Sequence, residues 1–337
     1  MKIKLKVKDS ICTFYNDDFQ NVLPKLEKVD LVVSDPPYAI GYSNKHVSSK
    51  DKWDDFSSSE FTSFMGNWLT SMYDILKPNG TCWFFYGFTR IREILDAIDS
   101  TKFINKLENH FVYARGKGRG AKNKLKSLRE ECAHLVKSED YTWNPQEYYR
   151  KVVVPYREKD GAPRGWANDP ISGDPTRWTS LGNVIPIFTS FEEVIAEERR
   201  GVVLDIGSGS RLPLSGDIYN LQFPPTPSVM SKIEKQIHSA QKSILILCML
   251  ILLSSKEGDT VLDCFGGSFS TAAACAITGR NFIGIERDKE AFEKGIDFVK
   301  NVPYDRWEKY VKSHISTGEK GGKFNFGVRS TMVKEIK

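Results

Sequence analysis

Apolar residues in the first hundred positions recur with two different periods. Val29 to Val33 is a short apolar run of the kind that forms a buried strand, and Pro36 and Pro37 cannot continue its hydrogen-bond ladder. From Ser58 to Leu76 the apolar residues return at helical spacing, and the segment 77–80, Lys-Pro-Asn-Gly, predicts the end of that helix. A strand over 81–86 and a helix over 89–98 follow. Because strands alternate with helices, the pattern predicts a parallel α/β sheet.

This alternation stops near residue 140 and returns near residue 244. The region between is rich in Pro, Gly, Trp and Tyr and shows little periodicity. The elements predicted beyond it are a helix over 244–253, a strand over 260–264, a helix over 270–277, a strand over 281–286 and a helix over 289–299. The sequence therefore predicts one sheet built from two halves of the chain, with an irregular insertion between them.

Neither the amino terminus nor the longest apolar run indicates a membrane segment. The first ten residues alternate Lys with apolar residues, which is typical of an edge strand and unlike the apolar core of a signal peptide. The run from Ile244 to Leu253 has ten residues, about half of what a membrane-spanning helix needs. We expect a buried core helix there and no membrane partner.

Composition narrows the class of protein further. Of 337 residues, 40% are hydrophobic and 27% are charged, which excludes a mainly disordered or fibrous chain. The six cysteines include no CxxC pair and no histidine cluster joins them, so we expect neither a metal centre nor a disulfide framework. A reducing compartment, the cytoplasm, is the expected location.

Positive charge is concentrated in one segment. The net charge is only +5, yet Arg115 to Arg129 contains seven basic residues, no acidic residue and three glycines. One interpretation is a solvated surface loop; the other is a mobile loop that follows a phosphate backbone. The candidate DNA-binding residues are Arg115, Lys117, Arg119, Lys122, Lys124 and Lys126. The tail after Val311 is also basic and Gly-rich, and we expect it to be poorly ordered.

The first motif with chemical content is Asp35-Pro36-Pro37-Tyr38, which directly follows the first buried strand. Ligands bind at the carboxyl ends of strands in open α/β sheets. A carboxylate and a backbone carbonyl held by two prolines can both accept hydrogen bonds from one NH2 group, and an aromatic ring can stack on a planar base. The alternative is a simple turn.

The second motif is Asp263-Cys264-Phe265-Gly266-Gly267-Ser268, here called the Gly motif, between a predicted strand and an Ala-rich helix. Glycines at such a turn let the backbone approach a cofactor. Glu286 follows Gly267 by nineteen residues at the end of the next strand, where an acid can bind ribose hydroxyls. An ordinary βαβ unit without a ligand is the alternative.

A second Gly-rich segment, Gly207-Ser208-Gly209, follows the apolar run Val202 to Ile206 and resembles a cofactor loop more closely. However, Pro213 and Gly216 make a following helix unfavourable, and prolines occupy 224, 225 and 227, where a ribose-binding acid is expected. We therefore interpret this segment as unrelated to cofactor binding.

Taken together, the motifs resemble the amino-group DNA methyltransferases, which use S-adenosylmethionine to methylate adenine N6 or cytosine N4. Their order along the chain is Asp-Pro-Pro-Tyr, the insertion, His-Ser-Ala-Gln-Lys at 238–242, then the Gly motif. This order is that of the beta class, in which the catalytic half precedes the cofactor half. The resemblance covers roughly residues 12–300 and includes the segments 16–23 and 137–144.

The resemblance implies a Rossmann-like α/β methyltransferase fold. We expect a mostly parallel, seven-stranded twisted sheet with helices on both faces and an irregular target-recognition insertion. The implied domains are 1–144, the catalytic half with the basic loop; 145–235, the insertion; 236–305, the cofactor half; and 306–337, a basic extension.

The family also implies roles for individual residues. The catalytic loop is Asp35, Pro36, Pro37 and Tyr38. The implied cofactor-binding residues are Asp18, Asp35, His238, Gln241, Lys242, Asp263, Phe265, Gly266, Gly267 and Glu286, with 238, 241 and 242 at the methionine end. No metal is expected.

The implied function is site-specific transfer of a methyl group to the N6 amine of a flipped-out adenine in duplex DNA. Asp rather than Ser before the two prolines favours adenine, and N4-cytosine is the first alternative. Three departures from the family pattern are Phe269 in place of a second Gly, Ser239, Ala240 and Ser243 in place of Pro, Thr and Pro, and Cys264 in place of Pro. They leave open a catalytically weak DNA-binding relative. A methyltransferase acting on RNA or on a protein glutamine amide, a homodimer and a companion restriction endonuclease also stay open.

Overall fold

The computed structural model describes residues 1–39, 55–119, 127–144, 147–150, 167–168, 175–180, 184–185, 203–205, 211–213, 241–314 and 333–335. Of residues 113–119, 127–129 and the short strands between 147 and 213, it describes the backbone alone. The other residues lie outside the described part of the chain.

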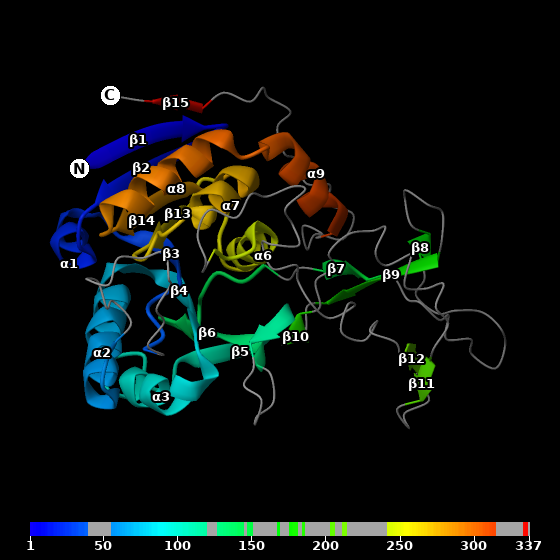
Figure 1. Cartoon of the computed structure of the whole chain (residues 1–337), viewed down its shortest axis with the longest axis horizontal. Helices are drawn as coiled ribbons and strands as arrows, with labels where there is room; N and C mark the ends of the chain where they lie inside the picture. Colours follow the sequence, from blue (N-terminus) through cyan, green and yellow to red (C-terminus); the bar gives the residue numbers. More distant parts are fainter. Residues whose placement is uncertain are drawn as a thin grey trace.

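A ten-stranded sheet forms the centre of the molecule, in the order β10-β5-β6-β4-β3-β13-β14-β2-β1-β15 (Figure 1). Its strands are β1 (Lys2–Val7), β2 (Ser10–Asn16), β3 (Val29–Ser34), β4 (Leu76–Tyr86), β5 (Leu107–Arg119), β6 (Ser127–Val136), β10 (Val184–Ile185), β13 (Thr260–Asp263), β14 (Asn281–Glu286) and β15 (Val333–Glu335). The run β4-β3-β13-β14-β2 is parallel throughout. The fold class is therefore confirmed as α/β with a mostly parallel sheet.

The expected number of seven strands is wrong for the described residues. The run from β5 to β2 supplies seven, while β10 extends one edge and β1 and β15 extend the other. The amino-terminal strand was expected at the edge, but β15 pairs antiparallel with its outer side through Leu5↔Glu335 and Val7↔Val333. Short pairings at the edges carry no periodic apolar signal, which is why the sequence did not reveal them.

Helices cover both faces of this sheet (Figure 1). They are α1 (Phe19–Val22), α2 (Ser58–Ile75) and α3 (Ile91–Asp99), and α6 (Ile244–Ser254), α7 (Ser270–Thr278), α8 (Lys289–Asn301) and α9 (Tyr304–His314). In β3, Leu31 and Val33 pack with the core under α6–α9, whereas Val32 packs with the core under α1–α3. Two covered faces explain why Leu31, Val32 and Val33 are consecutive apolar residues.

The helices predicted from periodicity are confirmed to within a few residues at their ends. Helix α2 begins where Ser57 and Glu60 form a reciprocal capping box. Every residue of α6 is buried, as expected for a core helix. Among the described residues, no helix is long and apolar enough to cross a membrane.

The described parts of the insertion are short strands. β7 (Glu147–Arg150), β8 (Ala167–Asn168) and β9 (Pro175–Ser180) form a three-stranded sheet. β11 (Val203–Asp205) pairs antiparallel with β12 (Arg211–Pro213) in a separate sheet. Gly207–Gly209 lies outside the described residues; the described residues that follow it, Arg211–Pro213, form a strand and not a helix, which supports its interpretation as unrelated to cofactor binding.

Helix α9 contributes to the core under α6–α8. Trp307 and Val311 are fully buried, and the boundary expected between 305 and 306 falls inside this helix. Lys8 and Glu308 form an ion pair that joins the first hairpin to α9. The first residues of the expected extension are therefore part of the fold.

We predict that Trp307→Ala lowers the free energy of unfolding by about 3–5 kcal/mol, because it leaves a large cavity in this core. Lys309→Ala, two residues away and exposed, is the control and should change it by less than about 0.5 kcal/mol. Urea denaturation measures both. Equal midpoints for Trp307→Ala and wild type would show that α9 is not part of the core.

Candidate functional site

Several of the predicted site residues lie together at the carboxyl ends of the parallel strands. Asp35 follows β3, Asp263 ends β13, Glu286 ends β14, and Asp18 comes two residues after β2. Neighbouring parallel strands end at the same edge, and the register Glu286↔Asn16 places the last two ends side by side. This edge is where open α/β sheets bind ligands.

Ser34 joins the two halves of the site. Its hydroxyl donates to Asp263 Oδ1 (3.1 Å) and accepts from the backbone N–H of Cys264 (3.0 Å). Ser34 is buried and directly precedes Asp35. The start of the catalytic loop and the start of the Gly motif are therefore held together. The sequence analysis missed Ser34, and only its position between a strand and Asp35 could have indicated it.

In the catalytic loop, Asp35 and Tyr38 are oriented by each other and by Lys242. The Tyr38 hydroxyl donates to Asp35 Oδ1 (2.7 Å), and Lys242 Nζ donates to Asp35 Oδ2 (2.6 Å) and to the Tyr38 hydroxyl (3.1 Å). The side chains of Asp35 and Lys242 are 21% and 7% exposed. Lys242 was expected at the methionine end of the cofactor pocket; in the structure its ammonium donates to the carboxylate of Asp35.

A second carboxylate lies beside Lys242. Glu130, on β6, is 4% exposed, and its Oε2 is 3.4 Å from Lys242 Nζ. The ammonium also lies over the ring of Phe85, 5.0 Å from its centre. The sequence analysis missed Glu130. The available signal was the pair Glu130-Glu131 in an apolar strand, because successive residues of a strand face opposite sides and both faces of this sheet are covered; the two acids are 4% and 1% exposed.

The Gly motif is held against Glu286 by backbone donors. Gly267 N–H donates to Glu286 Oε2 (2.8 Å), and Asp288 N–H donates to Oε1 (2.8 Å). Gly267 has a φ of 51°, a conformation that favours glycine. Burial raises the pKa of Glu286. Each oxygen of the Glu286 carboxylate has a further lone pair. The carboxylate therefore fits a pair of ribose hydroxyls beside the two glycines of the motif.

Asp263 braces the Gly motif from below. Its carboxylate accepts hydrogen bonds from Ser34 Oγ (3.1 Å), Phe265 N–H (3.1 Å) and Thr271 Oγ1 (2.8 Å). It is 3% exposed, and burial raises its pKa to about 6. It was expected to line the cofactor pocket; its bonds in the structure go to the backbone and hydroxyls that shape the motif.

The other expected cofactor residues lie around the same edge. Asp18 caps α1 by accepting from Gln20 N–H (2.9 Å), and its Oδ2 lies 3.9 Å from Arg287 Nη1. Phe265 is partly buried and packs edge-on against Phe19. Gln241 is buried next to Lys242. His238 lies outside the described residues.

Phe269, the main departure from the family pattern, points into the core. It is fully buried, and its ring packs edge-on against Phe14 (4.8 Å between centres) and Phe292 (5.7 Å). A Cβ at Gly266 would lie 2.0 Å from this ring, and a Cβ at Gly284 or Gly295 would also come within 3 Å of it. Because all three positions are glycine, they leave space for the ring of Phe269. The ring therefore packs beneath the Gly motif and not in the predicted cofactor pocket.

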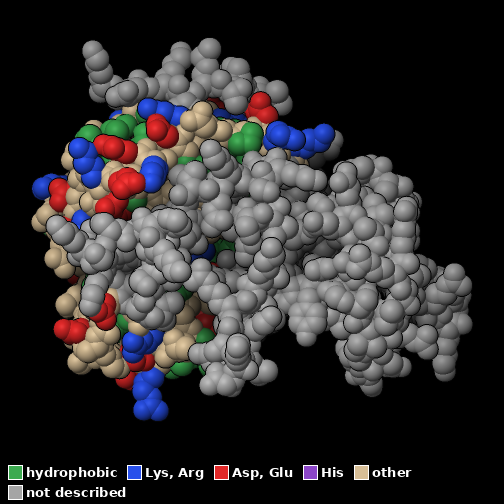
Figure 2. All heavy atoms as spheres, in the orientation of Figure 1, with side chains coloured by type: hydrophobic (Ala, Val, Ile, Leu, Met, Phe, Trp, Pro, Cys, Tyr) green, Lys and Arg blue, Asp and Glu red, His purple; other side chains and the backbone are tan. Residues whose placement is uncertain are grey.

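The basic segment has a more extended backbone than expected. β5 continues to Arg119 and β6 begins at Ser127, so two paired strands replace part of the predicted loop. Arg115, Lys117 and Arg119 lie on β5, with their side chains outside the description, and Lys122, Lys124 and Lys126 lie outside the described residues. On the described part of the face in Figure 2, basic and acidic side chains are interspersed.

Comparison with known proteins gives the same family as the motifs. The N6/N4 DNA methylase family model matches residues 29–297. The type II methyltransferase M2.DpnII of Streptococcus pneumoniae is 26% identical over 84% of this chain and 87% of its own length. M1.MboII of Moraxella bovis is 26% identical over 88% and 96%. The solved PvuII DNA methyltransferase, described as cytosine-N4-specific, is 14% identical, with a TM-score of 0.52 over 89% of this chain and 91% of that one. This last likeness shows the fold.

Packing of Phe269 against Gly266 can be tested by a double-mutant cycle. Phe269→Ala should lower the free energy of unfolding by about 3–5 kcal/mol because it opens a cavity. Gly266→Ala should cost about 1–3 kcal/mol in the wild type, because its Cβ overlaps the ring, and under about 0.5 kcal/mol in Phe269→Ala. Denaturation of the four proteins gives the coupling. Additive effects would mean that the ring does not fill this space.

Asp263 should make stability depend on pH. Its pKa is 3.8 when unperturbed and about 6 in the folded protein. Between these values the native state holds a proton that the unfolded state has lost, so stability falls as the pH rises through this window. We predict that the free energy of unfolding of Asp263→Asn, taken relative to that of the wild type, is about 2 kcal/mol higher at pH 7 than at pH 4. Denaturation at several pH values measures the difference, and a constant difference would refute the raised pKa.

Proposed function

Because the chain belongs to the N6/N4 DNA methylase family, we propose that it transfers a methyl group from S-adenosylmethionine to the N6 amine of adenine in duplex DNA. The observation that carries the proposal is the catalytic loop at the carboxyl end of β3, where Asp35 and Tyr38 are hydrogen-bonded to each other within one site that also contains the Gly motif. DNA methyltransfer is the activity of the family; the choice of adenine and the residue roles are proposals.

The catalytic loop acts on the exocyclic amine of the base. Such an amine is a poor nucleophile because its lone pair is delocalised into the ring, and the base must leave the duplex to expose it. We assign Asp35 and the carbonyl of Pro36 as acceptors for the two amine hydrogens, which favours a more tetrahedral nitrogen. Tyr38 stacks on the base and sets its plane. Positioning and electrostatics are the main contributions of the protein.

Lys242 shares Asp35 Oδ2 with the target amine, since this oxygen has a second lone pair. Its ammonium already donates to Asp35 Oδ2 at 2.6 Å, where an incoming N–H also needs an acceptor. Glu130 Oε2, at 3.4 Å, offers a second carboxylate to the same ammonium. A short shift of Lys242 toward Glu130 would open this oxygen further to the amine while the charge stays paired, which avoids leaving a buried ammonium without a counter-ion.

The residues around the Gly motif fit S-adenosylmethionine, the cofactor on which the family depends. When bound, it supplies an electrophilic methyl group on a sulfonium. We assign Glu286 to the ribose hydroxyls, the backbone of Gly266 and Gly267 to close approach, and Asp18 with Phe265 to the adenine end. Gln241, Lys242 and His238 are assigned to the methionine end. Asp263 supports the motif from beneath, and Phe269 lies outside the pocket.

Adenine rather than cytosine rests on Asp35, since Asp before the two prolines is the tendency of N6-adenine enzymes. The PvuII structure is that of a cytosine-N4-specific enzyme, so N4-cytosine is the second candidate. Mass analysis of nucleosides from DNA treated with the protein separates N6-methyladenine from N4-methylcytosine. We propose duplex DNA as the partner, with the basic segment from Arg115 to Lys126 along the phosphates, and keep the homodimer and the companion endonuclease as proposals.

We predict that Asp35→Asn lowers methyl transfer by about 10²–10³-fold, because an amide presents one acceptor and no charge to the target amine. Calorimetry should show that cofactor binding falls far less than methyl transfer, since Glu286 and the Gly motif are unchanged. Asp99→Asn, at an exposed position of α3, is the charge-matched control and should keep full activity. Wild-type rates in Asp35→Asn would refute the assigned role.

A further inference from the structure

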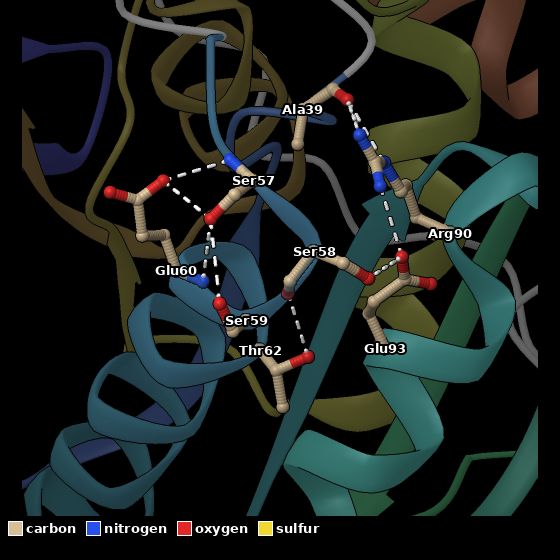
Figure 3. Close-up of polar contacts among 8 residues, drawn as sticks. All are labelled: Ala39, Ser57, Ser58, Ser59, Glu60, Thr62, Arg90 and Glu93. Carbon is tan, nitrogen blue, oxygen red and sulfur yellow. Dashed lines mark hydrogen bonds and ion pairs between the residues drawn. The ribbon is translucent and has the colours of Figure 1, made fainter.

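Arg90 binds the backbone of the residue that directly follows the catalytic loop. Its Nε and Nη2 both donate to the carbonyl oxygen of Ala39, at 2.9 and 2.6 Å. Ala39 directly follows Tyr38 and is buried. Figure 3 shows the guanidinium between this carbonyl and Glu93. Two donors from one charged group fix the direction of the carbonyl as well as its position.

Ala39 needs such a restraint because its backbone conformation is unfavourable. Its φ is 52°, in the left-handed region that residues with a Cβ avoid. Residues other than glycine are disfavoured in this conformation. Two hydrogen bonds from one charged donor offset that cost and hold the carbonyl in place.

Arg90 is itself held on its other side. Its Nη1 donates to Glu93 Oε1 (2.9 Å), and the same oxygen accepts from Ser58 Oγ (2.6 Å). The hydrogen bond from Ser58 and, after it, the pairing with Arg90 lower the pKa of Glu93. Ser58 is the first residue of α2, next to the Ser57–Glu60 capping box (Figure 3). The contact between Arg90 and Ala39 is thus supported by residues at the starts of α2 and α3.

The catalytic loop transmits this restraint to its functional groups. Pro36 and Pro37 restrict the backbone between Asp35 and Tyr38, and the Tyr38 hydroxyl is bonded to Asp35 Oδ1 at 2.7 Å. A movement of Ala39 would therefore displace both side chains together. Displacement by about 1 Å at a catalytic group can cost up to 100-fold in rate.

We propose that Arg90 is a positioning residue: by holding the Ala39 carbonyl, with Glu93 and Ser58 behind it, it sets where Asp35 and Tyr38 meet the target amine. The inference rests on the proposed methyltransfer. It assigns no contact between Arg90 and DNA or cofactor.

The test compares Arg90→Met, at the N-cap of α3, with Arg92→Met, an exposed arginine in the first turn of α3. We expect Arg90→Met to lower kcat by about 10–100-fold, with cofactor affinity by calorimetry within about threefold of wild type. Arg90→Lys, which keeps the positive charge but loses the planar fork, should fall between. Hydrogen exchange of the backbone amides of Asp35, Tyr38 and Ala39 should accelerate in Arg90→Met and stay unchanged in Arg92→Met.

Two results would overturn the inference. One is a kcat of Arg90→Met equal to that of Arg92→Met. The other is a loss of kcat matched by an equal loss of cofactor affinity, because a general structural defect would affect both. A wild-type protein that transfers no methyl group to DNA would instead refute the proposed function. In that case faster exchange confined to the Asp35, Tyr38 and Ala39 amides of Arg90→Met would still support the restraint on the loop.

Discussion

The whole site depends on one parallel pairing, that of β3 with β13. Leu31 and Val32 pair with Val261 and Leu262. Beyond this pairing, the hydroxyl of Ser34 forms hydrogen bonds with Asp263 and Cys264, about 230 residues further along the chain. Without this pairing the catalytic loop and the Gly motif would belong to separate halves. The free-energy cost of closing so long a loop grows only slowly with its length, so burial of both faces of the central strands can offset it.

Charge within the site is balanced in a way that the motifs alone do not show. Asp35, Lys242 and Glu130 form a chain of carboxylate, ammonium and carboxylate at distances of 2.6 and 3.4 Å. A buried ammonium between two acids remains paired wherever it moves between them. On the cofactor side, Asp263 and Glu286 each accept a hydrogen bond from a backbone N–H group. These N–H groups stabilise the carboxylates in place of positively charged side chains. These two arrangements give each half of the site its own electrostatic support.

The sequence predicted the regular elements well and the non-local contacts poorly. The α2, α6, α7 and α8 helices and strands β3, β13 and β14 follow from periodicity and from Pro and Gly positions, because those signals are local. The edge pairing of β15, the inward side chain of Glu130 and the grip of Arg90 on Ala39 depend on which segments meet in space. Phe269 shows the same limit: its effect depends on Gly266, Gly284 and Gly295, which only the fold brings to one ring.

Photolabelling tests most directly whether the two halves form one site. S-adenosylmethionine tritiated in its methyl group, irradiated in the presence of the protein, labels side chains that contact that methyl. The account predicts label in the peptide that carries Asp35–Tyr38, together with loss of cofactor binding in Glu286→Ala. Label confined to peptides that do not come from the carboxyl edge of β3, β13 and β14 would contradict it.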